Sequence, residues 1–300
     1  MSNTLLEAFL LIAIGMAARF SGLVEEQDNR ILSRFVFNVT LPFLVFLAMF
    51  RQHPSFVYLK ISLLTWLLLG VFTAIVYYTA RYFIKDPKRL GVFVLTSVGG
   101  NTAFLGYAVI HSLAGDAGMP AAVVYDQFGN GLFIYTVLLL LIAHLAHRSI
   151  TPWKLIASVV TPPFIALLIG LVFPAWIRLP GFMLSSFELL GNVTTPLMMV
   201  IVGMNLTKPI RLQAVPMFGA ASIIKLVLLP AAMYVLASFI SIPPSPMKIT
   251  VLQSAMPSMM SSVIFAQIYD LDESLAAQIV FGTTLISFFS LQFIWALLGG

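Results

Sequence analysis

The chain has 300 residues, of which 60% are hydrophobic and 9% are charged, and its formal net charge at pH 7 is +5. Soluble domains carry about a quarter of charged residues, so this composition excludes an ordinary soluble protein and predicts an all-α polytopic membrane protein. The chain has no cysteine, which excludes disulfides, thiolate metal sites and a cysteine nucleophile.

Ten apolar stretches follow one another along the chain, and each is long enough for a membrane span of about 20 residues. They lie near residues 4–20, 31–50, 58–83, 90–112, 120–146, 154–174, 182–206, 214–240, 247–268 and 275–298. The connections are short, so we predict one integrated membrane domain.

Basic residues predict the orientation of these spans. The loops after the first, third, fifth and seventh spans carry Arg19, Arg30, Arg34, Arg81, Lys85, Lys88, Arg89, Arg148, Lys154, Lys208 and Arg211. The positive-inside rule then predicts a multi-pass protein of the plasma (inner) membrane with both termini on the extracytoplasmic side. Because the positive charge lies mainly between spans, we predict no nucleic-acid partner.

An internal repeat relates the two halves of the chain. The segment Asn38–Pro42 (NVTLP) recurs as Asn192–Pro196 (NVTTP), an offset of 154 residues from position 38 to position 192. At a similar offset, Phe9–Gly15 resembles Phe164–Gly170. Each half holds five spans, an odd number, so the second half enters the membrane from the opposite side and the repeat is predicted to be inverted.

The repeated segments are predicted to kink their helices. Pro42 and Pro196 each remove a helical hydrogen bond, and the side chains of Asn38 and Asn192 and their neighbouring hydroxyls can satisfy freed backbone groups. Direct contact with a substrate is the alternative interpretation.

Two spans are interrupted at matching places in the two halves. Small and polar residues around Gly100 and Asn101 interrupt one span, and Pro257 and Ser258 interrupt the other. Non-helical backbone survives at membrane depth only inside protein or against a water-filled cavity. Paired interruptions of this kind predict broken helices at the binding site of a transporter.

The chemistry of these breaks suits an anion. We predict that the second half of each broken helix begins near Thr102 and Ser258, where unpaired N–H groups carry a partial positive charge. Gly100, Asn101, Thr102, Pro257 and Ser258 therefore form the candidate substrate site. The alternative interpretation is that the glycines only allow neighbouring helices to pack closely.

Three motifs together resemble a known family: NTAFLG at Asn101–Gly106, AMP at Ala255–Pro257 and AQIYD at Ala266–Asp270. With the ten-span length, they are similar to the auxin efflux carrier family, in its short bacterial branch that includes malonate-type transporters. The resemblance covers essentially the whole chain. It implies two inverted five-helix repeats, 1–150 and 151–300, in which helices 4 and 9 are broken and cross.

The same resemblance implies a division of labour between helices. Helices 1, 2, 6 and 7 would form a scaffold, and helices 3 to 5 and 8 to 10 a moving core. Asn101 and Pro257 would lie at the crossing, beside a site for a small organic anion. A homodimer formed through the scaffold is compatible with the resemblance.

Lys225 lies inside the span 214–240, where a lysine costs on the order of 3 kcal/mol at the membrane centre. One hypothesis is that it neutralises a substrate carboxylate, as a further substrate-binding residue, or exchanges a proton. The alternative is that it extends to the membrane surface or pairs with a structural acid.

Three further polar residues are candidates for ion coupling. Asp126 and Asn130 are four residues apart and share a helical face, and a lone buried carboxylate can carry a proton. Glu188 is the third candidate. In each case the alternative is a purely structural role, and both H+ and Na+ are open as coupling ions.

The sequence therefore predicts a secondary active transporter or uniporter of small organic anions. A sodium-coupled symporter of the bile-acid type is the alternative, and a channel or sensor is a weaker one. An enzyme needs a cluster of catalytic groups that this sequence does not display, and no catalytic residue, metal or cofactor is predicted. The chain has no nucleotide-binding loop, so transport would use ion or substrate gradients.

Overall fold

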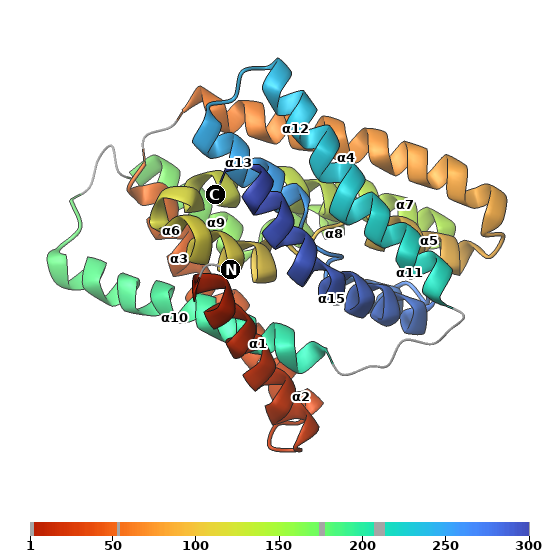
Figure 1. Ribbon diagram of the computed structural model, residues 1–300, viewed down its shortest axis with the longest axis horizontal. Helices are drawn as coiled ribbons and strands as arrows, with labels where there is room; N and C mark the ends of the chain where they lie inside the picture. The colour runs from red at the N-terminus through yellow and green to blue at the C-terminus, as the bar shows by residue number, and fades with distance from the viewer. Residues whose placement is uncertain (1–2, 53–54, 174–177, 207–213, 300) are drawn as a thin grey trace.

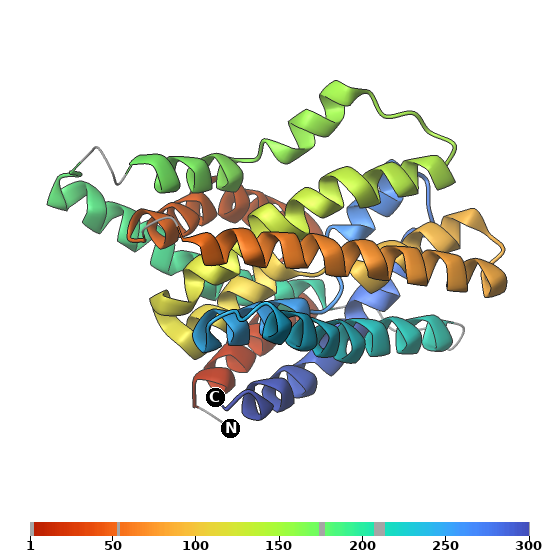
Figure 2. The same cartoon turned by 90° about the horizontal axis from the view of Figure 1, so that it is seen from above.

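The computed structural model of the protein describes residues 3–52, 55–173, 178–206 and 214–299. In this part of the chain the regular elements are helices, as the composition predicts, joined by one isolated antiparallel bridge between Gly100 and Ser258. The helices form one bundle, and the beginning of the first helix (Asn3–Phe20) and the end of the last (Glu273–Leu297) lie close together on its surface (Figures 1 and 2). Lys208 and Arg211, used above for the predicted orientation, lie outside the described residues.

The elements follow in chain order, with η marking a π-helical turn. The first half contains α1 (Asn3–Phe20), α2 (Glu26–Phe35), η1 (Val36–Thr40), α3 (Leu41–Phe50), α4 (Phe56–Phe83), α5 (Pro87–Val98), η2 (Thr102–Gly106), α6 (Tyr107–Val124), η3 (Tyr125–Gly131), η4 (Ile134–Leu138) and α7 (Leu139–Leu145). The second half contains α8 (Pro152–Val159), α9 (Pro162–Val172), α10 (Gly181–Asn205), α11 (Val215–Ile223), η7 (Ile224–Leu228), α12 (Leu229–Phe239), α13 (Pro244–Ser254), α14 (Ser262–Ile268) and α15 (Glu273–Leu297).

Six stretches of the described chain are long and apolar enough to cross a membrane unaided, or seven if the bent pair α8 and α9 counts as one span. The predicted count of ten is not confirmed. Predicted spans 90–112 and 247–268 are divided into short helices by the two interruptions. In addition, Gly115, with φ 59° and ψ −157°, turns the chain inside α6, within a stretch that otherwise reads as one long span.

The repeated NVT segments differ in their local structure. Before Pro42 the chain forms the π-helical turn η1, and the Asn38 amide donates to the Arg34 carbonyl at 2.8 Å. Pro196 lies inside the continuous helix α10, where Thr194 donates to Leu190 and the exposed Asn192 has no hydrogen bond with the described residues. The Asn38 side chain thus binds a backbone carbonyl of the preceding turn, whereas the Asn192 side chain binds none in the described structure. The kinks at Pro42 and Pro196 stay predictions.

Two pairs of helices approach until their backbones touch. At the crossing of α1 and α10, Gly15 and Gly203 each face the backbone of the opposite helix so closely that an added Cβ would collide with it. At the crossing of α9 and α3, a Cβ on Gly170 would lie 2.8 Å from the Phe46 carbonyl oxygen. Small residues permit such close packing in membranes, where lipid competes equally well for larger apolar side chains.

We predict that Gly203→Ala destabilises the protein, because the new methyl group has no room against the backbone of α1. Overpacking of this kind costs about 1–3 kcal/mol in unfolding free energy. The measurement is the thermal unfolding midpoint of the purified protein in detergent. Gly219→Ala is the matched control, since a Cβ there meets no atom within 4 Å. Equal midpoints for the two variants would contradict the packing argument.

Candidate functional site

The two predicted interruptions meet in space. Gly100 and Ser258 pair as an antiparallel bridge, and the Asn101 amide donates to the Pro257 carbonyl at 2.8 Å. α5 and α13 end at this point, and η2 and α14 begin beyond it. The membrane interior offers no water to unpaired backbone groups. At the crossing, backbone groups of one break form hydrogen bonds with backbone groups of the other.

The two helix starts beyond the crossing differ. η2 begins at Thr102, as predicted. The second start, predicted near Ser258, lies four residues later, at Ser262. The reason is that Ser258 belongs to the bridge, and its backbone N–H donates to the Thr283 hydroxyl at 3.2 Å instead of opening a helix.

The carbonyl groups at the end of α5 take donors from several different elements. Helical hydrogen bonding cannot serve them, because the chain leaves the helix after Val98. The donors are the Ser258 hydroxyl to Thr96 (2.6 Å), Lys225 Nζ to Val98 (2.9 Å), the Met259 amide to Gly99 (3.0 Å) and Asn130 Nδ2 to Gly100 (3.1 Å). Groups of the protein itself therefore satisfy the carbonyls at the buried end of α5.

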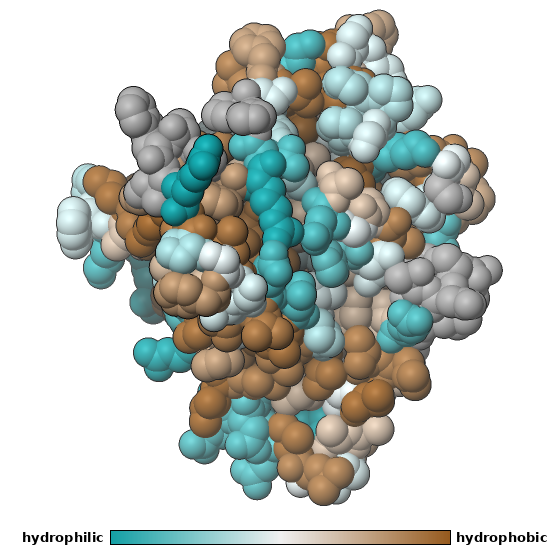
Figure 3. Space-filling view, turned by 90° about the vertical axis from the view of Figure 1, so that its left-hand side faces the viewer, coloured by the Kyte–Doolittle hydropathy of each residue, from teal (hydrophilic) through white to brown (hydrophobic). Residues whose placement is uncertain are grey.

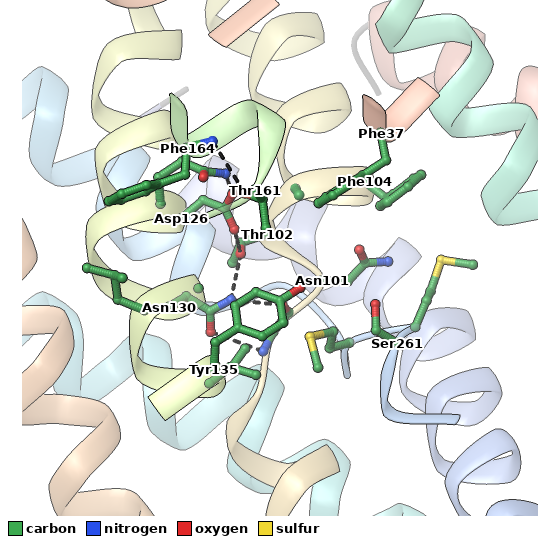
Figure 4. A pocket seen from close by; sticks show the side chains of 18 of the residues that line it. Phe37, Asn101, Thr102, Phe104, Asp126, Asn130, Tyr135, Thr161, Phe164 and Ser261 are labelled. Carbon is green, nitrogen blue, oxygen red and sulfur yellow. Dashed lines mark hydrogen bonds between the residues drawn. The ribbon is translucent and has the colours of Figure 1, made fainter. Parts of the chain in front are cut away.

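A buried carboxylate lies on the other side of the break. Asp126 accepts hydrogen bonds from the Thr102 hydroxyl, the Tyr107 hydroxyl (2.6 Å) and the Gln127 amide (2.7 Å). Asn130 Nδ2 donates to Thr102 Oγ1 at 2.7 Å, and Asn130 Oδ1 accepts from the Gly100 backbone N–H at 3.3 Å. Figure 4 shows this continuous connection from the carboxylate to the crossing.

A pocket of about 650 Å³, counting the open space at its mouth, lies beside the crossing. Asn101, Thr102 and Asp126 line its polar side, and Phe37 and Phe104 lie together on another side (Figure 4). Among the described residues that line it, Asp126 is the one with a formal charge. The amide nitrogen of Asn101 is buried and has no hydrogen-bond partner in the described part of the chain, so a donor is free at this pocket.

Gln253 of α13 binds the start of η2. Its amide nitrogen donates to the carbonyls of Thr102 (3.3 Å) and Ala122 (3.4 Å). A Cβ on Gly106 would collide with this side chain, so the last glycine of the NTAFLG motif allows α13 to approach. The glycine therefore has a packing role one turn beyond the polar residues of the break.

Four predicted substrate or coupling residues do not line the pocket. Pro257 and Ser258 form the crossing, and the other two lie elsewhere. Lys225 is on η7, only 1% exposed, and does not line the pocket. Glu188 pairs with Arg51, which also contacts Asp116 at 3.4 Å. Glu188 lies on α10 and its side chain is partly exposed. Figure 3 shows the end of the molecule where α10 begins, a face on which hydrophilic side chains gather between apolar regions.

A second charged group lies in the loop before α15, outside the spans. The hydrogen bond from Lys88 Nζ to Asp270, at 2.7 Å, lowers the pKa of that carboxyl. Asp272 caps α15 by accepting from the Leu275 N–H at 2.9 Å. These acids support the loop and the helix start.

Several residues of the site were not predicted from the sequence. Tyr107 and Gln127 bind Asp126, and Thr161 and Phe164 reach the pocket from the second half of the chain. Tyr107 follows Thr102 by five residues, the spacing of a π-helical hydrogen bond. Predicting that Tyr107 and Thr102 share a face therefore requires predicting the π-helical turn η2. Thr161 and Phe164 carry no local signal.

Two broken helices that meet beside a partly polar pocket, in a multi-pass apolar bundle, define the class of membrane transport proteins. A family model described as "Membrane transport protein" matches residues 1–295. The chain therefore belongs to this family, the auxin efflux carrier family that its motifs indicated.

Two relatives from archaea resemble the chain over nearly its whole length. An uncharacterized transporter of Methanocaldococcus jannaschii is 28% identical over 294 residues, which cover 95% of this chain and 94% of the relative. An uncharacterized transporter of Methanothermobacter thermautotrophicus is 27% identical over 300 residues, which cover 98% and 97%. Both relatives carry the name of a transporter without a substrate.

We predict that Asn130→Leu strongly destabilises the crossing, because the backbone N–H and carbonyl of Gly100 both lose their partner. Each buried group left unsatisfied costs about 1–3 kcal/mol. Thermal unfolding in detergent measures the loss. Asn192→Leu is the matched control, because the Asn192 side chain is exposed and unbonded in the described structure. A loss no greater than that of the control would contradict the bridging role of Asn130.

Proposed function

We propose that this protein is a secondary carrier of small organic anions, carboxylates in particular, which works by alternating access. The observation that carries the proposal is the start of η2 at Thr102, beside a pocket lined by an unpartnered Asn101 amide. A helix start favours negative charge through its N–H groups and partial positive charge. The Asn101 amide adds a directed donor for a carboxylate oxygen.

Asp126 supplies the coupling in this proposal. It lines the same pocket as the proposed anion, and the lining residues that the structure describes include no cationic side chain. Two negative charges in a low-dielectric site repel each other strongly. The anion therefore binds when Asp126 holds a proton, and the two cross the membrane together. Thr102 and Asn130 connect the protonation state of Asp126 to the Gly100 peptide at the crossing.

The side chains that face Asp126 are neutral, so a bound proton is the proposed means of neutralising its carboxylate. Tyr107 of α6 and Gln127 of η3 bind it directly, and Tyr135 of η4 lines the same pocket. These partners are neutral donors that can turn to serve either the ionised or the protonated carboxyl group. Glu188, paired with Arg51 outside the pocket, takes no part in coupling.

The proposed alternating access depends on two inverted repeats of five spans each. The contacts of Gly15 with the Val200 carbonyl and of Gly170 with the Phe46 carbonyl support this assignment. Val200 and Phe46 are 154 positions apart, the same offset as the repeated NVT segments. Helices 1 and 7, and helices 6 and 2, would thus make equivalent pairs in the scaffold, against which the core with the crossing moves.

The direct test is uptake into proteoliposomes. A panel of labelled mono- and dicarboxylates and neutral solutes is offered with and without Na+, and with and without an inward proton gradient. We expect saturable uptake of a carboxylate, and we expect the proton gradient to accelerate this uptake. Neutral solutes should not be taken up. Uptake of neutral solutes alone would overturn the anion assignment, and a requirement for Na+ would overturn the proton assignment.

We predict that Asp126→Asn removes the response to protons, because the amide resembles the protonated acid at every pH. Wild-type uptake should rise as pH falls and Asp126 becomes protonated. The variant should exchange labelled for unlabelled anion at a rate independent of pH, without accumulation driven by a proton gradient. Glu188→Gln is the control and should keep the wild-type pH profile. A variant that retains proton-driven accumulation would exclude Asp126 as the proton carrier.

We predict that Asn101→Ala lowers kcat/KM for the anion about 10- to 100-fold, the usual effect of losing one hydrogen bond to a charged group. The unfolding midpoint should stay close to that of the wild type, because the missing amide nitrogen has no partner in the described structure. Initial rates over a range of substrate concentrations measure the first effect, and thermal unfolding the second. Unchanged kinetics would remove Asn101 from the binding site.

A further inference from the structure

Lys225 is a buried cation at the end of a broken helix. It lies on η7, is 1% exposed, and its Nζ donates to the Val98 carbonyl at 2.9 Å. A Cβ added to Gly100 would lie 3.0 Å from the same Nζ atom. The ammonium group therefore fills the space beside the last turn of α5 and the first extended residues of the break.

No carboxylate among the described residues forms an ion pair with Lys225. The elements packed around η7 are α5, α11, α12 and α15. Their ionisable side chains are Lys88 and Arg89 at the start of α5, Tyr234 on α12 and Glu273 at the start of α15. A buried charge is normally paired with an opposite one, and here the opposite partial charge is that of the C-terminal end of α5.

The other groups that hold the end of α5 are neutral. The hydroxyl of Ser258, the amide nitrogen of Met259 and the side-chain amide of Asn130 serve Thr96, Gly99 and Gly100 respectively. Among these four carbonyls, the described contacts give a basic side chain as donor to Val98 alone.

Helix C-termini and unwound carbonyls at breaks are the places where carriers with broken helices bind a coupling Na+. The contacts of Lys225 have the same chemistry, since an ammonium group on carbonyl oxygen replaces a metal ion on carbonyl oxygen. We propose that Lys225 is a tethered cation in the cation site at the C-terminal end of α5, and that the protein needs no Na+ there. Lys225 is then a positioning residue, which acts on the substrate through the shape of the break.

One consequence of this inference, sodium-independent transport, rests on the proposed transport function. The cation site itself can be tested without a substrate. Shortening the side chain in Lys225→Ala leaves space beside the Val98 carbonyl that a hydrated Na+ can occupy. The matched variant Lys225→Met removes the same charge but fills most of the same volume.

The test is the thermal unfolding midpoint of purified full-length protein in detergent, titrated with NaCl against choline chloride at constant ionic strength. The wild type should show no saturable response to Na+. Lys225→Ala should unfold at a lower temperature in choline chloride and recover on the order of 5 °C as Na+ saturates the site. Lys225→Met should be destabilised in both salts and should not recover.

Three results would overturn the inference: a saturable Na+ response in the wild type, an equal response in Lys225→Met and Lys225→Ala, or no recovery of Lys225→Ala. Absence of folded Lys225→Ala in NaCl counts as no recovery. Because no substrate is present, these results leave the anion assignment untouched. Conversely, failure of carboxylate uptake by the wild type would leave the cation site standing.

Discussion

The structure depends on one constraint, which is that a helix broken inside a membrane must find partners for its backbone within the protein. The bridge between Gly100 and Ser258 supplies part of this need, and side chains supply the rest. The partners come from four separate regions of the chain, around Asn130, Lys225, Ser258 and Thr283. The break therefore depends on tertiary contacts between distant segments. Residues that look like a binding site are therefore also residues that hold the fold, and mutational tests have to separate the two roles.

The buried carboxyl group of Asp126 and the buried amino group of Lys225 complement the two helix ends at the break. Asp126 lies at the start of η2, where the partial charge is positive, and Lys225 lies at the end of α5, where it is negative. Each side chain compensates the helix end it faces, although the two are not paired with each other. The partial charge of each helix end is thus offset by the charge of the side chain beside it. In the proposed mechanism, the proton and the anion both bind near Asp126, so they would change the charge at the start of η2 and not at the end of α5.

The geometry also explains how a small pocket could control a large motion. Asp126, Thr102, Asn130 and the Gly100 peptide form one connected set of hydrogen bonds. The proposed mechanism requires that a change at the Asp126 carboxylate passes through these hydrogen bonds to the Gly100 peptide at the crossing. In the proposed mechanism, substrate and proton binding therefore act directly on the element around which the core turns.

By itself, the sequence determined the membrane class, the helical content, the family, and the positions of the two breaks at Gly100 and Pro257. These signals are local, because they depend on composition, on spacing and on glycine and proline. Only the tertiary structure decided that Ser258 is extended and α14 begins at Ser262, that Tyr107 and Gln127 hold Asp126, and that Lys225 binds Val98. The Lys225 contact joins residues 127 positions apart, and no local pattern specifies which distant donor will reach an unpaired carbonyl.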